Sequence, residues 1–342
     1  MFARMARRAG TEPYREYYSR HPSLQGIDDR MRGMPLLGEP GGQFYHSSIM
    51  GEANRFFSDI ALIRPDDATV HLFANRLRNA RDPSATVKGI LRELGAVAAG
   101  CTSLDVSLVY SHKGRFDADY GRPVELNHPI VILFLVEMDY AQMRSAPRAE
   151  TLRESARQYY RAAAISKTLS AVLHECGYDA TSHHDAHYDL ILPGLAVRAG
   201  LGELGRNNIL VADRFGSRVR IGAVSTTMAL RIDRQVDLGV DHFCRICRKC
   251  ARSCPARALS FGDKSDVRGV AKWGTHVEQC YSYWRSVGTD CGICMAVCPF
   301  SHRSSWFHTL IRFVIRRASW SHRWAHFFDQ AFYGKSWKGV RQ

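Results

Sequence analysis

The distribution of cysteine constrains this sequence more than any other feature. Of its ten cysteines, Cys101 and Cys176 stand alone, whereas the other eight lie between Cys244 and Cys298. Scattered disulfides in a secreted protein would not be concentrated in so short a segment. The concentration therefore predicts a separate cofactor-binding unit at residues 239–302.

The spacing of these cysteines is typical of iron–sulfur ligands. Residues 244–255 read C-x2-C-x2-C-x3-C-P, the run of bacterial ferredoxins, in which three thiolates hold one [4Fe–4S] cluster and the fourth ligates a second cluster. The second half is stretched at its front and ends in the same way, at Cys298-Pro299. Crossing the fourth ligands predicts two sets: Cys244, Cys247, Cys250 and Cys298, and Cys254, Cys280, Cys291 and Cys294.

A pair of structural zinc sites is the alternative, because sets of four cysteines also suit zinc. Both tight runs end in Cys-Pro and contain no histidine, so two [4Fe–4S] clusters are favoured. Two neighbouring clusters form a path for electrons. The sequence has neither a P-loop pattern nor a convincing G-x-G-x-x-G after a strand. The segment before the cysteines must then hold another redox centre or present a docking face.

Upstream of the cysteines, the hydrophobic pattern predicts a mixed α/β (α+β) fold. Helical spacing predicts helices at residues 84–95 and 150–176, and runs of apolar residues predict strands at 105–110, 129–136 and 218–225. We expect four parts: an N-terminal cap at 1–80, an α/β domain at 81–238, the cluster unit at 239–302, and a C-terminal tail at 303–342 that packs on the core.

Charge and hydropathy limit the partners. The formal net charge of +14 suits nucleic acid, an acidic protein or an anionic substrate, and it does not decide among them. The longest apolar run, residues 130–136, is too short to span a bilayer, and no apolar stretch follows the basic start. We therefore expect a cytoplasmic protein without a membrane partner. The tail alternates aromatic and basic residues as an interfacial helix does, but packing against its own domain is favoured.

A glycine-rich stretch ahead of the cysteines, together with several short motifs, resembles a known protein family. Residues 199–208 read A-G-L-G-E-L-G-R-N-N, and F-G-S-R-V-R follows at 215–220, ahead of the cysteine run. Further short motifs lie at residues 17–22, 137–140 and 332–335. The motifs and their order resemble those of the cobalamin-dependent reductive dehalogenases, from about residue 14 to 338.

This resemblance implies a nitroreductase-like α/β domain that holds cobalamin in the base-off form. It implies that Gly200, Gly202 and Gly205 allow the backbone to approach the corrin or its nucleotide loop. It further implies that Tyr159 is the catalytic proton donor and that Arg220 is the basic residue paired with it. The adjacent Tyr160 remains an alternative for the proton donor.

The chain departs from the family in the substrate pocket. Where many members have a Gly-Asn pair, residues 182–187 read S-H-H-D-A-H. Asp185 or His187 is therefore expected to face the ligand. The histidines and the aspartate of this segment would also suit a mononuclear metal site, which is the alternative interpretation.

The resemblance implies reductive dehalogenation of a small organohalide, R–X + 2e⁻ + H⁺ → R–H + X⁻. An external ferredoxin or flavodoxin is the expected electron donor. The related epoxyqueuosine reductases act on tRNA, and the basic charge favours that alternative slightly. Glu203, Arg206 and the motif at 137–140 favour the dehalogenases, so a nucleic-acid partner is not expected. A third possibility is an electron-transfer protein without cobalamin.

Overall fold

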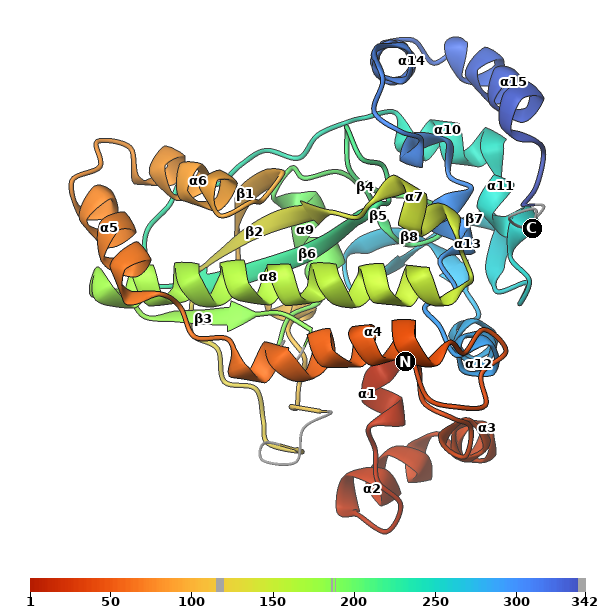
Figure 1. Cartoon of the computed structure of the whole chain (residues 1–342), viewed down its shortest axis with the longest axis horizontal. Helices are drawn as coiled ribbons and strands as arrows, with labels where there is room; N and C mark the ends of the chain where they lie inside the picture. The colour runs from red at the N-terminus through yellow and green to blue at the C-terminus, as the bar shows by residue number, and fades with distance from the viewer. Residues whose placement is uncertain (115–119, 186, 188, 338–342) are drawn as a thin grey trace.

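The centre of the molecule is a four-stranded sheet in the order β1-β2-β6-β3, in which every neighbouring pair is antiparallel (Figure 1). The computed structural model describes residues 1–114, 120–185, 187 and 189–337. Within these residues the strands of the sheet are β1 (Ala98–Ser103), β2 (Ile130–Glu137), β3 (Ala180–His183) and β6 (Val219–Thr226).

Strand β2 is buried on both faces, which explains its continuous run of apolar residues. Ile132 and Phe134 point into one hydrophobic core, whereas Leu133 and Leu135 point into a second core on the opposite face. Because side chains alternate along a strand, a strand covered on both faces needs an apolar residue at every position. This strand fixes the middle layer of the domain.

Helices cover both faces of the sheet. Helix α8 (Ala149–Glu175) lies along one face and α9 (Leu192–Arg198) packs against the other. Helix α4 (Ser47–Asp59) packs on α8, and α5 (Asp67–Arg78) and α6 (Pro83–Glu93) complete the first core. Because Phe73 and Leu77 of α5 belong to that core, the last part of the expected N-terminal cap is integral to the α/β domain.

Three helices near the N-terminus, α1 (Phe2–Met5), α2 (Glu12–Arg20) and α3 (Pro22–Arg32), pack on one another, and α3 contacts α12 (Val277–Val287). Arg4 connects α1 to α12 through an ion pair with Glu278 of 2.5 Å. Helix α12 carries Cys280, so segments far apart in the sequence meet at the cysteine-rich unit.

The cysteine-rich unit is built from short helices and a hairpin. It contains α10 (Val240–Cys247), α11 (Lys249–Ser253), α12 and α13 (Ile293–Ala296). Strands β7 (Leu259–Val267) and β8 (Val270–Thr275) form the hairpin. The glycine-rich stretch supplies the pair β4 (Glu203–Leu204) and β5 (Leu210–Val211) beside it. Helix α7 (Tyr140–Arg144) follows β2 and contacts α13.

The mixed α/β class and both expected helices are confirmed, and the expected strands at 129–136 and 218–225 are β2 and β6. The expected strand at 105–110 is wrong. Its centre is a 3-10 helix, η2 (Val106–Leu108), because the Asp105 carboxylate accepts a hydrogen bond of 2.8 Å from the Ser107 N–H and caps the turn.

The tail forms two helices, α14 (Trp306–Arg317) and α15 (Ser321–Tyr333), at one corner of the molecule (Figure 1). It contacts the cysteine-rich unit through Ile315 and His322, which are buried. The expectation that its aromatic stripe packs inward is wrong, because these side chains are largely exposed. Residues 338–342 of the expected tail lie outside the described residues. No helix in the described ranges is long and apolar enough to cross a membrane.

Candidate functional site: two thiol groups beside a cavity

The eight clustered cysteines are free thiols that form two groups in space. One cavity is lined by the first group, Cys244, Cys247, Cys250 and Cys298. In the second group, Cys280 and Cys254 lie close enough to Cys291 to raise the pKa of its thiol, and all three act in the same way on Cys294. These groups coincide with the two crossed sets, and their role as cluster ligands stays a prediction.

Burial disfavours the thiolate form of these side chains. Burial is the main cause that raises the pKa of Cys247 to about 12 and that of Cys291 to about 12. It also raises the pKa of Cys294 well above its usual value. A thiolate in such surroundings requires a compensating cation, and the irons of a cluster are such cations. The two groups therefore fit iron–sulfur clusters.

The alternative of a mononuclear metal site concerns the histidines and the aspartate at residues 182–187, of which residue 186 lies outside the described residues. Among the described residues, no group of three or more His, Cys, Asp or Glu side chains could hold one ion. In the segment at 182–187, both ring nitrogens of His183 form hydrogen bonds within the protein. Its Nδ1 accepts from the Asp189 N–H at 3.4 Å, so its Nε2 donates to Ser225 Oγ at 2.9 Å. This histidine acts as a buried structural residue.

Two residues of the glycine-rich stretch attach the cysteine-rich unit to the α/β domain. The Glu203 carboxylate accepts hydrogen bonds from the N–H groups of Leu238 and Val240, at 2.6 and 3.2 Å, at the start of α10. The buried Arg206 donates to the carbonyl oxygens of Cys244 and Ser260, at 3.1 and 2.7 Å. These bonds fix the position of the first thiol group relative to the sheet.

A cavity of about 370 Å³ lies between the middle of α8, strand β6 and the loop that leads to α9. Tyr159 of α8 and Arg220 of β6 line it together, with the guanidinium carbon 4.8 Å from the centre of the tyrosine ring. Tyr160 points elsewhere, with its ring 5.9 Å from that of Phe56. The geometry thus favours Tyr159 over Tyr160 as the residue that can reach a ligand.

Arg220 is held by two further residues, neither of which was predicted from the sequence. It donates to Ser155 Oγ at 2.7 Å and to Asp290 Oδ2 at 3.1 Å. Burial alone would lower the pKa of Arg220, but Tyr159, Asp290 and Asp185 raise it, so the guanidinium stays charged. Burial raises the pKa of Asp290 despite the opposing effect of Arg220. The only sequence signal for Asp290 is its position directly before Cys291.

The two residues expected to face the ligand behave differently. Asp185 lines the cavity, whereas the ring of His187 donates to the Ser182 carbonyl oxygen at 3.3 Å. His184, which was not predicted, lines the cavity as well. Asn208, also not predicted there, lines the cavity too and donates to the Trp273 carbonyl oxygen at 2.6 Å. The contacts of Asp185 and His187 with substrate stay predictions.

At Gly200 and Gly202 another backbone segment of the protein lies too close to leave room for a side chain. A Cβ atom at Gly200 would lie 2.3 Å from the Arg234 carbonyl oxygen, and one at Gly202 would lie 2.3 Å from that of Val211. Both residues have positive φ angles, of 71° and 157°. Gly205 lines the cavity of the first thiol group instead. Their expected contact with a corrin stays a prediction, because packing alone accounts for Gly200 and Gly202.

The lining of the cavity is that of a ligand-binding site, largely apolar with a few polar groups. Its walls are mostly aliphatic, with Leu190, Ile191 and Ile221 among them. Two buried nitrogen atoms of lining residues, Nδ1 of His184 and Nε of Arg220, have no hydrogen-bond partner among the described residues. Because such atoms are rare in folded proteins, they suggest a polar ligand at this position, and the amide side chains of a corrin could serve.

A known protein family matches the cysteine-rich unit. Residues 243–302 match the family model of a 4Fe-4S dicluster domain. The tetrachloroethene reductive dehalogenase of Desulfitobacterium hafniense is 32% identical over 215 residues, which are 60% of this chain and 38% of that protein. The corresponding enzyme of Sulfurospirillum multivorans is 31% identical over 263 residues, 67% of this chain and 52% of that protein.

Solved structures with a similar fold include a reductive dehalogenase. A catabolic reductive dehalogenase in complex with 3-bromo-4-hydroxybenzoic acid matches 75% of this chain and 37% of its own length, with 27% identity and a TM-score of 0.69. A weaker similarity links 35% of this chain to 34% of the epoxyqueuosine reductase of Lactococcus garvieae, at 30% identity over 125 residues. The chain thus spans about half or less of the length of these relatives. By sequence and by fold, it is a homologue of the reductive dehalogenases.

Proposed function

We propose that this protein is a cobalamin- and iron–sulfur-dependent reductase that removes halide from a small organic molecule. One observation carries the proposal: Tyr159 and Arg220 share a wall of the cavity, and Asp290, which binds Arg220, directly precedes Cys291. A potential proton donor, a fixed positive charge and the second thiol group are therefore contiguous.

The residues around the cavity have separate tasks in the net reaction R–X + 2e⁻ + H⁺ → R–H + X⁻. Bound cobalamin would supply the reducing power that breaks the carbon–halogen bond. The Tyr159 hydroxyl donates the proton that ends on carbon, and the Arg220 guanidinium stabilises the tyrosinate that remains. The aliphatic walls keep water away, so the proton comes from a positioned group rather than from solvent.

The two thiol groups would hold two [4Fe–4S] clusters in series. We place the group that contains Cys291 and Cys294 nearer the cavity, because Asp290, which binds Arg220, directly precedes Cys291. The group around Cys244, of which Cys244 and Cys247 lie on α10, would then be the outer one. We infer that electrons pass from an external ferredoxin or flavodoxin through the outer cluster to the inner one.

The proposal is tested by anaerobic purification and reconstitution. The protein should contain about eight iron atoms per chain. Added cobalamin should bind and change the visible spectrum, and halide should be released from tetrachloroethene or from 3-bromo-4-hydroxybenzoic acid under a chemical reductant. Those two compounds are taken from the names of the relatives. Full iron content without cobalamin uptake would instead identify an electron-transfer protein.

Reduction of epoxyqueuosine in tRNA is the second candidate. The net charge of +14 and the similarity to an epoxyqueuosine reductase favour it. A modified tRNA stem loop in the same reconstituted assay separates the two functions. Turnover of the tRNA without halide release from any tested organohalide would move the assignment to that reaction.

A further inference from the structure

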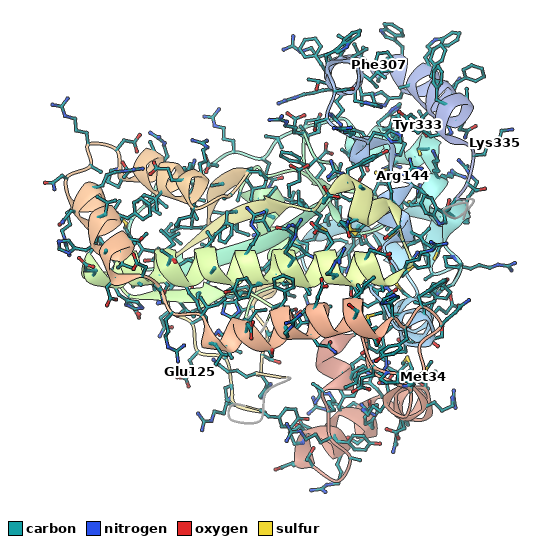
Figure 2. The ribbon with its side chains drawn as sticks, viewed as in Figure 1. Met34, Glu125, Arg144, Phe307, Tyr333 and Lys335 are labelled. Atoms are coloured by element: carbon teal, nitrogen blue, oxygen red, sulfur yellow. The ribbon has the colours of Figure 1, made fainter. Side chains whose placement is uncertain are left out.

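The last two helices carry a conspicuous set of exposed aromatic side chains. Trp306, Trp320 and Trp324 are 79%, 72% and 60% exposed, and Phe327 and Phe332 are similarly open. Figure 2 shows ring-bearing side chains that project outward from α14 and α15 at one end of the molecule, with Phe307 and Tyr333 labelled there. Contiguous exposed apolar surface of this kind marks an interaction site.

Each helix has one face packed and the other face open. On α14, Trp306, Leu310 and Phe313 recur at the spacing of one helical face and are exposed, whereas Arg312 and Ile315 are buried. On α15, Trp324, Phe327 and Phe328 are exposed, whereas the buried residues are Ser321, His322 and Asp329. The buried residues fix the pair on the protein, so the aromatic faces are held outward.

Within residues 303–337 the exposed charges have one sign, although Arg316 also pairs with Asp213 outside this segment at 3.9 Å. Between residues 303 and 337 the basic residues are Arg303, Arg312, Arg316, Arg317, Arg323 and Lys335. The single acidic residue, Asp329, is buried, forms an ion pair with Lys249 at 2.6 Å and accepts a hydrogen bond from Nε2 of His302 at 2.7 Å. Arg317 lies over the Phe313 ring, 4.5 Å from its centre, so cations and aromatic rings are interleaved.

We propose that α14 and α15 form an amphipathic hairpin that docks this protein on an anionic lipid surface. Trp306, Leu310 and Phe313 of α14, with the matching face of α15, enter the boundary between headgroups and acyl chains. Arg316, Arg317 and Arg323 pair with anionic headgroups. Helices of 12 and 13 residues are too short to span a bilayer, so they lie in its plane. On this point the proposal differs from the expectation of no membrane partner.

A lipid surface accounts for these features better than an acidic protein does. A soluble electron carrier would complement the arginines, but transient electron-transfer interfaces are small and would leave several large rings in water. Tryptophan, with an apolar body and one N–H donor, is enriched where lipid meets water. The proposal depends on exposure and charge alone and is independent of the reaction catalysed.

The test uses the full chain, purified anaerobically with its clusters. It measures sedimentation with phosphatidylcholine vesicles that do or do not contain phosphatidylglycerol. We expect binding to the anionic vesicles that weakens as salt rises. The triple variant Trp306→Ser, Leu310→Ser, Phe313→Ser should bind at least about tenfold less. A control variant, Leu62→Ser, Leu72→Ser, Val106→Ser, removes exposed apolar side chains elsewhere and should bind as the parent does.

Three outcomes would overturn the proposal. Equal vesicle binding by the parent and the α14 variant would show that this face does not meet lipid. Loss of a dimer in the α14 variant, seen by analytical ultracentrifugation, would show that the face joins two copies of the chain. Loss of ferredoxin binding with vesicle binding absent in the parent would assign the face to a protein donor. Iron content and cluster absorbance establish that each variant is folded.

Discussion

At the scale of single residues, the proton donor is the sharpest expectation. Tyr159→Phe keeps the ring against Arg220 but removes the hydroxyl, so cobalamin and iron content should stay normal while turnover falls by about a hundredfold or more. Tyr160→Phe is the matched control, because its ring lies toward Phe56 and its turnover should be unchanged. Full activity of both variants would make Asp185 the next candidate.

Asp290 should position Arg220 rather than touch substrate. Asp290→Asn leaves the buried guanidinium without its charged partner, so the free energy of unfolding should fall by about 3 kcal/mol. Turnover should fall by about tenfold, mainly in kcat, because Arg220 is less well placed beside Tyr159. Asp213→Asn removes a 3.9 Å ion pair with Arg316 at the surface and should change neither quantity. Normal kcat in Asp290→Asn would contradict the positioning role.

His183 should make the protein sensitive to acid. Burial, followed by neighbouring histidines, lowers the pKa of His183 from 6.5 to about 3. Below about pH 6.5 the unfolded chain binds a proton that the folded one does not, so stability is lost as the pH falls toward the folded-state value. Between about pH 7 and about pH 5.5 the loss is about 1 kcal/mol. His183→Gln should reduce this dependence in thermal unfolding, and the exposed His71→Gln should not.

At the scale of elements, the crossed arrangement of cysteines makes an asymmetric prediction. Cys254→Ala should impair the cluster held by Cys280, Cys291 and Cys294 and spare the outer one, although Cys254 belongs to the first sequence run. Cys298→Ala should do the reverse. Electron paramagnetic resonance of the reduced variants distinguishes the two signals. Loss of the outer cluster in Cys254→Ala would show that the ligands are not crossed.

The sequence predicted those elements whose signal is local. Helix α8 and strand β2 have long, regular apolar patterns, and the cysteine sets follow from short spacings. Strand β1 was missed because A-A-G-C-T-S has little strand character. It becomes a strand by pairing with β2, where Gly100 has no room for a side chain, since a Cβ would lie 2.2 Å from the Ala199 carbonyl oxygen. Asp290 was missed because its partner Arg220 is 70 positions away.

At the scale of the whole molecule, the basic charge should govern the encounter with an acidic electron donor. Oppositely charged partners attract each other over about 10 Å at moderate salt, and added ions screen this attraction. The rate at which reduced ferredoxin reduces the clusters should therefore fall steeply with ionic strength. A small neutral reductant serves as the control and should show no such dependence. A salt-independent rate with ferredoxin would leave the charge of +14 without a role in electron delivery.

The ion pair between Arg4 and Glu278 has a consequence for how the protein is made. These residues are separated by 274 positions, and Glu278 lies on the helix that carries Cys280. At bacterial synthesis rates the ribosome needs roughly fifteen seconds to a minute to cover that distance. Until then α1 lacks this docking partner, and the thiol of Cys280 does not yet exist. Complete assembly of the two proposed clusters therefore follows the synthesis of Cys298, the last of the eight clustered cysteines.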